Sequence, residues 1–227
     1  MNKGKFIVLE GLDGSGKSTQ TTLLLDAIRN RGIDAEFIHF PRTDSSSPFY
    51  GPMLKRFLKG ELGSLAEVDP WFVAMLFAGD RRNEGPAIAA LLNEGKWVIA
   101  DRYVLSNIAF QGAKINSQKE KSELAHWILN TEYNVFHLPV PDQTFFIHMP
   151  LSFCRGNVLN QRSGADRDYL DGKADIHEAD FSFQNEVYEM YRYMLSKPEF
   201  GLTDLQINEP VPDPAEIHSM LMQLIEC

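Results

Sequence analysis

Cysteine is nearly absent from this chain of 227 residues, which has only Cys154 and Cys227. Two thiols cannot form the disulfide framework of a small secreted domain, and neither has a metal-ligand spacing to histidines, so structural zinc is not expected.

Long apolar segments are missing too. The longest nearly apolar run is the nine residues 71–79, whereas a membrane-spanning helix needs about 20. The apolar run at residues 6–9 is too short for a signal peptide, so we expect a cytoplasmic protein that does not enter a membrane.

An excess of positive charge is also lacking, because 22 Lys and Arg face 31 Asp and Glu, for a net charge of −9. This balance argues against a protein that coats the phosphate backbone of nucleic acid. Hydrophobic residues make up 44% of the chain, with 16 Gly and 12 Pro, which excludes intrinsic disorder and collagen-like repeats. The length fits one α/β domain over residues 1–227 better than two independent domains.

Short apolar runs alternate with helical patterns along the chain. The predicted strands are residues 6–9, 35–40, 97–100, 144–149 and 205–208. The predicted helices follow the first strand up to Gly32 and then cover 52–59, 70–93, 122–130 and 214–226. This alternation predicts a parallel five-stranded sheet with helices on both faces. The polar segment at 161–180 is expected to form a mobile excursion on the surface.

A glycine-rich loop carries the strongest functional signal. Residues 11–18 (GLDGSGKS) place two glycines five apart, followed by Lys17 and Ser18, between a predicted buried strand and a helix. Glycines let backbone N–H groups turn toward an anion, the helix N-terminus is electropositive, Lys17 adds a charge and Ser18 can ligate Mg²⁺. The loop predicts nucleotide binding. An ordinary glycine turn is the alternative, and the strand–helix context argues against it.

Several classes of nucleotide protein lack support. The Asn-Lys-x-Asp motif of GTPases is absent, and the only Asp-x-x-Gly lies inside the loop itself. The dinucleotide-binding pattern Gly-x-Gly-x-x-Gly does not occur either. At the end of the third predicted strand, Asp101 is followed by Arg102. A carboxylate there is typical of a residue near the metal in phosphate-loop proteins, although a helix cap is the alternative.

Separated blocks carry a family resemblance: residues 10–20 (EGLDGSGKSTQ), 40–42 (FPR), 76–81 (LFAGDR), 101–107 (DRYVLSN), 109–112 (AFQG) and 138–142 (LPVPD). In these blocks the chain resembles the thymidylate kinases, phosphate-loop nucleoside monophosphate kinases that make dTDP from dTMP and ATP on the route to dTTP. The resemblance covers the first two thirds of the chain well and the last third weakly. It implies a phosphate-loop kinase fold with a mobile lid.

The resemblance implies a site for Mg-ATP on the loop, formed by Gly11, Leu12, Asp13, Gly14, Ser15, Gly16, Lys17, Ser18 and Thr19. Lys17 and Mg²⁺ would neutralise the phosphates, with Ser18 as a metal ligand. Asp101 would hold Mg²⁺ through water or orient the acceptor. Arg102 would align the attacking phosphate of dTMP. A general base is unnecessary, because that phosphate is already largely ionised near neutral pH.

The implied dTMP site combines arginines, aromatic rings and polar side chains: Asp13, Phe40, Arg42, Phe77, Arg81, Arg102, Ser106, Asn107, Phe110 and Gln111. Asp13 would accept a hydrogen bond from the 3′-OH, and Arg42 and Arg102 would grip the phosphate bidentately. Phe77 would stack on thymine, with Arg81 one helical turn later at the edge of the base.

The remaining members would complete the walls of the dTMP site. Ser106 and Asn107 would approach the base, Phe110 would lie under the sugar and disfavour a 2′-OH, and Gln111 would extend the polar wall. Simpler roles compete with all of these: a turn residue at 13, surface ion pairs for the arginines, a core aromatic at 77, and helix-start packing for 106–111.

One position departs from part of the family. Some thymidylate kinases have a loop arginine where this chain has Gly14, and others supply a cation from a lid. Arg162 and Arg167 are the catalytic lid candidates here, and their alternative role is to be solvated partners of nearby acidic residues. The resemblance also implies a homodimer, with residues 71–77 as a possible contact. Adenine contacts are expected near 208–213, and residues 114–137 receive no role.

Two rival functions stay open. A deoxynucleoside kinase would use the same loop but needs a carboxylate base, for which Glu10 is available. A regulatory module that binds nucleotides would need no acceptor site. The pair Arg42 and Arg102 favours an acceptor that already carries phosphate. Nothing in the sequence separates dTMP from dUMP.

Overall fold

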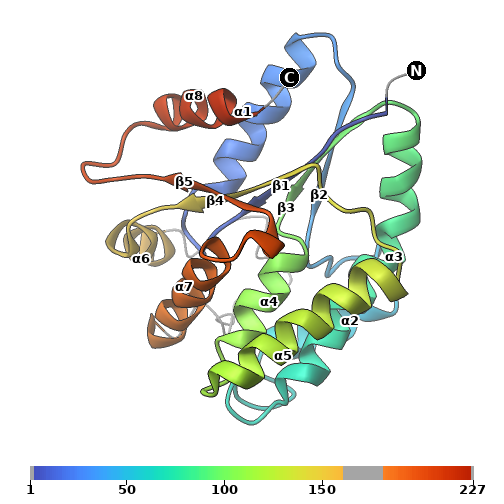
Figure 1. The fold of residues 1–227 in the computed structure, drawn as a ribbon, viewed down its shortest axis with the longest axis vertical. Coiled ribbons are helices and arrows are strands. Elements are labelled where there is room, and N and C mark those ends of the chain that lie inside the picture. The colour runs from blue at the N-terminus through green and yellow to red at the C-terminus, as the bar shows by residue number, and fades with distance from the viewer. Residues whose placement is uncertain (1–2, 161–180, 226–227) are drawn as a thin grey trace.

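The protein is represented by a computed structural model, which describes residues 3–160 and 181–225. Its centre is a five-stranded parallel sheet in the order β2-β3-β1-β4-β5 (Figure 1). The strands are β1 (Phe6–Glu10), β2 (Ala35–His39), β3 (Trp97–Asp101), β4 (Gln143–His148) and β5 (Leu202–Gln206). The predicted α/β class and strand number are confirmed.

The strand β1 is the central strand, and all five of its residues are buried. Leu9 is in register with Asp101 of β3 and with Phe145 of β4. Because the carboxyl ends of parallel strands meet at one edge of a sheet, the loops after β1 and β3 lie side by side there. This edge carries the glycine-rich loop and the Asp101–Arg102 pair.

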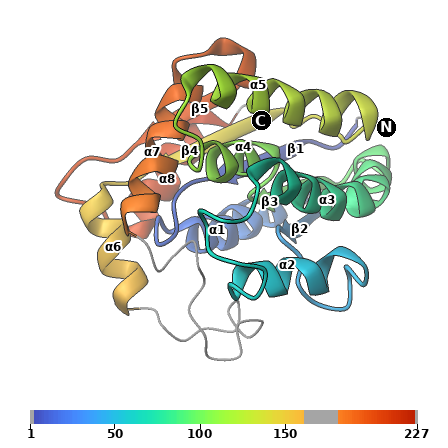
Figure 2. The same ribbon diagram turned by 90° about the horizontal axis from the view of Figure 1, so that it is seen from below.

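Helices cover both faces of the sheet. They are α1 (Lys17–Asn30), α2 (Tyr50–Leu58), α3 (Pro70–Asn93), α4 (Val104–Gly112), α5 (Gln118–Leu129), α6 (Leu151–Asn160), α7 (Phe181–Leu195) and α8 (Pro214–Leu224). A π-helix, η1 (Asn130–Val135), continues α5, and a 3-10 helix, η3 (Pro198–Phe200), precedes β5. Figures 1 and 2 show α1 beside α8 on one face and α4, α5 and α7 on the other.

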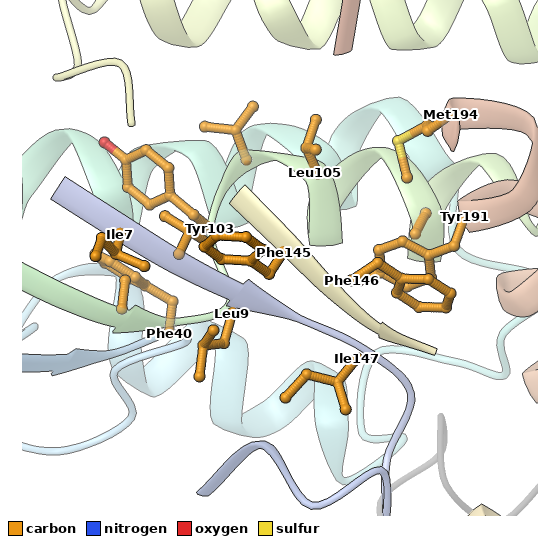
Figure 3. Close-up of a cluster of buried hydrophobic side chains, with 14 of the residues drawn as sticks. Ile7, Leu9, Phe40, Tyr103, Leu105, Phe145, Phe146, Ile147, Tyr191 and Met194 are labelled. Atoms are coloured by element: carbon orange, nitrogen blue, oxygen red, sulfur yellow. The ribbon is translucent and has the colours of Figure 1, made fainter. Parts of the chain in front are cut away.

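The core is aromatic where α7 meets the sheet. The rings of Phe146 on β4 and Tyr191 on α7 stack with centroids 4.5 Å apart (Figure 3). Phe6 of β1 meets Tyr103 edge to face, with the ring centroids 5.0 Å apart. These contacts fix α7 and the start of α4 against the strands. No helix within residues 3–160 and 181–225 has the length and apolar character needed to cross a membrane.

Several predicted boundaries differ from the structure. The last strand begins at Leu202, three residues earlier than predicted, because β5 buries only Leu205 fully and so lacks an apolar run. Helices α6 and α7 were not predicted, and α4 was expected only as a helix start at 106–111. The apolar pattern of 70–93 also places Met75 with Trp71 and Ala78 on the core side of α3, but Met75 is exposed. The predicted lid at 161–180, with Arg162 and Arg167, lies outside the described residues.

Candidate active site

The glycine-rich loop joins β1 to α1 through two left-handed residues, Gly14 (φ 76°) and Gly16 (φ 84°). Only glycine adopts this conformation without steric cost, which accounts for both positions. The Lys17 ammonium folds back over the loop and donates to the carbonyl of Leu12 at 2.7 Å and that of Gly11 at 3.3 Å. Burial and repulsion from Arg102 lower the pKa of Lys17. The loop therefore holds a buried cation over its backbone.

Gly14 also touches α6. A Cβ atom at this position would lie 2.4 Å from the carbonyl oxygen of Cys154, and the amide of Asn157 donates to the carbonyl of Gly14 at 2.9 Å. A backbone oxygen at that distance excludes any side chain. The absence of a loop arginine at this position thus has a structural cause. Beyond the loop, Ser18 and Thr19 are exposed in the first turn of α1.

The loop is joined directly to the Asp101–Arg102 segment. Arg102 donates to Asp13 Oδ1 at 2.5 Å, and Gln184 of α7 donates to Asp13 Oδ2 at 3.0 Å. Burial opposes ionisation of Asp13, but the charges of Arg102 and Lys17 outweigh it and lower the pKa of this carboxyl. Burial likewise disfavours the charged form of Arg102, but the negative charge of Asp13 outweighs it and raises the pKa of Arg102. Two buried groups of opposite charge therefore meet between the loop and β3.

Arg102 adopts a left-handed backbone, with φ 66°, which is costly for a side chain of this size. Its backbone N–H donates to the carbonyl of Leu9 at 2.9 Å. The guanidinium lies over the ring of Phe110 at 4.9 Å and donates to the hydroxyl of Ser106 at 3.1 Å. The structure thus brings together four residues of the predicted dTMP site: Asp13, Arg102, Ser106 and Phe110.

Glu10 holds the start of α4. Its side chain is fully buried and accepts from the backbone N–H groups of Tyr103 at 3.0 Å and Ser106 at 3.1 Å. The Ser106 hydroxyl at 2.5 Å and the Tyr191 hydroxyl at 2.8 Å bind its other oxygen. A carboxylate at a helix N-terminus satisfies N–H groups that have no partner within the helix. Because both oxygens are occupied by buried donors, the structure argues against Glu10 as a general base.

Asp101 lies beside the loop and beside His39. Its Oδ2 is 3.6 Å from His39 Nδ1, and its Oδ1 is buried without a hydrogen-bond partner in the described part of the chain. Burial raises the pKa of this carboxyl, but the nearby His39 imidazole and the charges of Lys17 and Arg102 outweigh burial and lower the pKa to about 2. Asp101 is therefore an ionised carboxylate with one free oxygen.

Arg42 is held by acidic residues of α3. Its guanidinium contacts the Asp80 carboxylate at 3.1 Å and pairs with Glu84. The buried ring of Phe40 lies 5.8 Å from the guanidinium carbon. Arg42 thus forms ion pairs with α3, and these pairs fix the direction of its side chain.

A second buried pair lies deeper, between α3 and η1. Arg81 binds Glu132 through Nε at 2.5 Å and through Nη2 at 2.7 Å. Asn107 donates to the same carboxylate at 3.0 Å. Phe77 is half-buried, with its ring edge-on to Phe57 at 6.3 Å. Arg81 and Asn107, predicted at the base, therefore share one partner.

The structure adds two residues that the sequence did not indicate. Glu132 lies in the segment that received no role, and Gln184 lies in the weakly matched last third. Neither belongs to a recognisable motif, so no local signal pointed to them. Gln111, which was predicted, is buried and accepts from Lys114 at 2.7 Å.

Comparison with known proteins agrees with this geometry. The family model for thymidylate kinase matches residues 9–204. A thymidylate kinase of Plasmodium falciparum is 31% identical over 191 residues, covering 84% of this chain and 77% of the relative. The thymidylate kinase of Brachyspira hyodysenteriae is 31% identical over 209 residues, covering 91% and 93%. The solved structure of thymidylate kinase from Candida albicans shares the fold, with TM-score 0.71 and 23% identity over 98% of this chain and 91% of that one. The chain belongs to the thymidylate kinase family, whose members phosphorylate dTMP to dTDP with ATP.

Proposed function

We propose that the contact between Asp13 and Arg102 joins the ATP site to the dTMP site, so that the two phosphates meet in line. The single observation that carries this proposal is the hydrogen bond of 2.5 Å between them. Asp13 belongs to the phosphate loop and Arg102 to the start of α4, so the donor loop and the acceptor arginine are adjacent. Positioning and charge neutralisation supply most of the catalysis in phosphoryl transfer.

On the donor side, ATP binds to residues 11–19. The backbone N–H groups of the loop and the N-terminus of α1 face the phosphates, and Lys17 exchanges its carbonyl partners for phosphate oxygens. Adenine is expected near residues 208–213, close to α1, because Gln20 donates to the carbonyl of Pro214 at 2.9 Å. Arg162 and Arg167, outside the described residues, stay the predicted lid cations.

The residues beside the loop fit a magnesium ion. Ser18 offers an exposed hydroxyl, and Asp101 offers a buried carboxylate oxygen without a partner in residues 3–160 and 181–225. Mg²⁺ prefers oxygen ligands and is commonly held by one or two protein groups, with waters and phosphates completing its shell. When bound, it supplies positive charge to the transferring phosphates. Ser18 and Asp101 are the residues that would hold it.

On the acceptor side, Arg102 and Arg42 bind the phosphate of dTMP. Each guanidinium has five N–H donors, so a phosphate can bind while the carboxylate partners keep the side chain oriented. Asp13 accepts from the 3′-OH of the sugar, which lies on Phe110. The base stacks on Phe77, flanked at its edge by Arg81, Asn107 and Ser106. Phe40 and Gln111 complete the walls.

A coupled assay of ADP release tests the proposal with dTMP, thymidine or no acceptor. We expect turnover with dTMP only; turnover with thymidine would indicate a deoxynucleoside kinase, and none at all a regulatory module. Arg102→Ala should lower kcat/KM for dTMP by about 30-fold to 1000-fold with little change in ATP affinity. Lys17→Met should abolish transfer. Equal losses of affinity for both nucleotides in Arg102→Ala would contradict the role of Arg102.

Two further expectations belong to this proposal: a cytoplasmic location, from the short apolar run at residues 6–9, and a homodimer, from the family resemblance. Phe72 and Met75 on α3 are exposed by 50% and 40%, and apolar side chains of this size favour a protein contact. The double variant Phe72→Ser with Met75→Ser should be a monomer in sedimentation experiments, whereas the unaltered chain should be a dimer. A monomeric unaltered chain would contradict the homodimer.

A further inference from the structure

Glu132 is the common partner of the two residues placed at the edge of the base. It lies in the π-helix η1 and is fully buried. Arg81 of α3 binds it through two nitrogens, and Asn107 of α4 donates to its Oε1. A π-helix is rare and is frequently found at functional sites. One carboxylate therefore ties α3, α4 and η1 together.

The contacts of Asn107 determine which way its amide points. Its Nδ2 donates to Glu132 Oε1 and to the carbonyl of Ala74, both at 3.0 Å. A carboxylate paired with arginine and a backbone carbonyl are both acceptors without a hydrogen to give. Turning the amide over would place Oδ1 against two oxygens. Glu132 and Ala74 thus fix the NH₂ group on their side.

The other end of the amide is left as a free acceptor. Asn107 is only 2% exposed, and its Oδ1 is buried without a hydrogen-bond partner among residues 3–160 and 181–225. A buried acceptor is costly to leave unpaired, so a ligand that brings an N–H group to it gains affinity. Within the same residues, Arg81 binds Glu132 through Nε and Nη2, which leaves Nη1 to donate elsewhere.

We propose that Glu132 is a positioning residue that makes the site select pyrimidines with a carbonyl at C4 and a hydrogen on N3. This inference rests on the proposed function, in which Asn107 and Arg81 face the base. Thymine and uracil present an N3–H donor beside the O4 acceptor, and cytosine presents an N3 acceptor beside the N4 amino donor. The fixed Asn107 acceptor and Arg81 donor match the first pattern and oppose the second.

The selection therefore separates dTMP and dUMP from dCMP, and it does not read the methyl group of thymine. Glu132 itself does not touch the base. It acts by accepting hydrogen bonds from two nitrogens of Arg81 and by holding the Asn107 amide in one orientation. Loss of the orientation, and not loss of a contact with substrate, is the defect that a variant should show.

Glu132→Gln tests the inference, because the glutamine amide can donate to Asn107 Oδ1 and let the Asn107 amide turn over. We measure kcat/KM for dTMP, dUMP and dCMP. The ratio of dTMP to dCMP should fall at least 30-fold, with dTMP and dUMP losing in parallel and the KM for ATP within threefold of the unaltered enzyme. A purely structural role would lower all three substrates equally, and that outcome overturns the inference.

Two further measurements keep the test decisive. Glu132→Asp keeps a charge beside Arg81 but shortens the side chain by one methylene, so it carries the test if Glu132→Gln does not fold. The ratio of kcat/KM for dTMP to that for dCMP should fall at least fivefold in this variant, and an unchanged ratio overturns the inference.

The unaltered enzyme is also assayed with N3-methyl-dTMP. Turnover equal to that of dTMP would show that Asn107 does not face N3, which defeats that part of the proposed function as well. Rejection of N3-methyl-dTMP together with unchanged ratios in the variants would defeat the role of Glu132 alone.

Discussion

Gly14→Ala should destabilise the protein more than Gly32→Ala, because both glycines have a left-handed backbone but only Gly14 is crowded by another helix. Gly14 has φ 76°, and an added Cβ would lie 2.4 Å from the carbonyl oxygen of Cys154 and 3.2 Å from Cβ of Asn157. Gly32, after the C-terminal end of α1, has φ 77° and no atom within 4 Å of such a Cβ. The pair therefore separates strain in the backbone from collision with α6.

The magnitudes follow from these two contributions. A left-handed backbone costs an L-residue about 1–2 kcal/mol, which is the whole effect expected for Gly32→Ala. Crowding a packed backbone adds about 1–3 kcal/mol, because either the loop or α6 must move. Gly14→Ala should therefore lower the free energy of unfolding by about 2–5 kcal/mol in total.

Urea unfolding of the unaltered chain and of both variants measures these differences. We expect Gly14→Ala to be the less stable variant by more than 1 kcal/mol, about the lower bound of the crowding contribution. Equal stabilities of Gly14→Ala and Gly32→Ala would refute the close approach of α6 to the loop. In that case the absence of an arginine at position 14 would need another cause.

Three other predictions concern buried groups. The pKa of Asp101 falls from 3.8 to about 2 on folding, which contributes about 2 kcal/mol of stability above pH 4 that is lost as the pH falls toward 2. Asp101→Asn should therefore be less stable than the unaltered chain at pH 7 in urea; the difference should shrink to about half near pH 3 and close at about pH 2. Burial raises the pKa of the Cys154 thiol to about 12, so iodoacetamide at pH 8 should label Cys154 only after unfolding, as peptide mapping would show; rapid labelling of the folded chain would contradict its burial. Glu10→Ala leaves the hydrogens of Tyr103, Ser106 and Tyr191 unpaired and should cost more than about 3 kcal/mol, against about 1 kcal/mol for Tyr191→Phe in the same denaturation assay.

The parts of the fold that sequence reasoning predicted are those with local signals. The strand β1 is a short apolar run buried on both faces, and the loop after it has a fixed spacing of glycines and Lys17. Asp101 was placed correctly at the carboxyl end of a strand beside β1, because parallel strands end at one edge. Each of these features is contained in fewer than a dozen neighbouring residues.

The parts that were missed depend on distant partners. Glu10 binds Ser106, 96 positions later, and Arg81 binds Glu132, 51 positions later. No spacing rule connects such pairs, since only the packed sheet and helices bring them together. The start of the edge strand β5 was predicted three residues too late for a different reason, because exposed Thr203 and Asp204 interrupt its apolar pattern. Local periodicity reports burial, and an edge strand that is half exposed gives a weak signal.

The helix α4 is held by acidic side chains from three different parts of the chain. Glu10 binds the backbone of its first turn, Glu132 orients Asn107 within it, and Asp13 binds Arg102 just before it. Three acidic groups from β1, η1 and the phosphate loop thus converge on one helix of nine residues. Under the proposed function, a change on the inner face of α4 would disturb the base site, the sugar site or the link to the phosphate loop. We therefore expect few substitutions within α4 to leave dTMP binding intact, whereas the loop alone needs only glycines, a lysine and a hydroxyl.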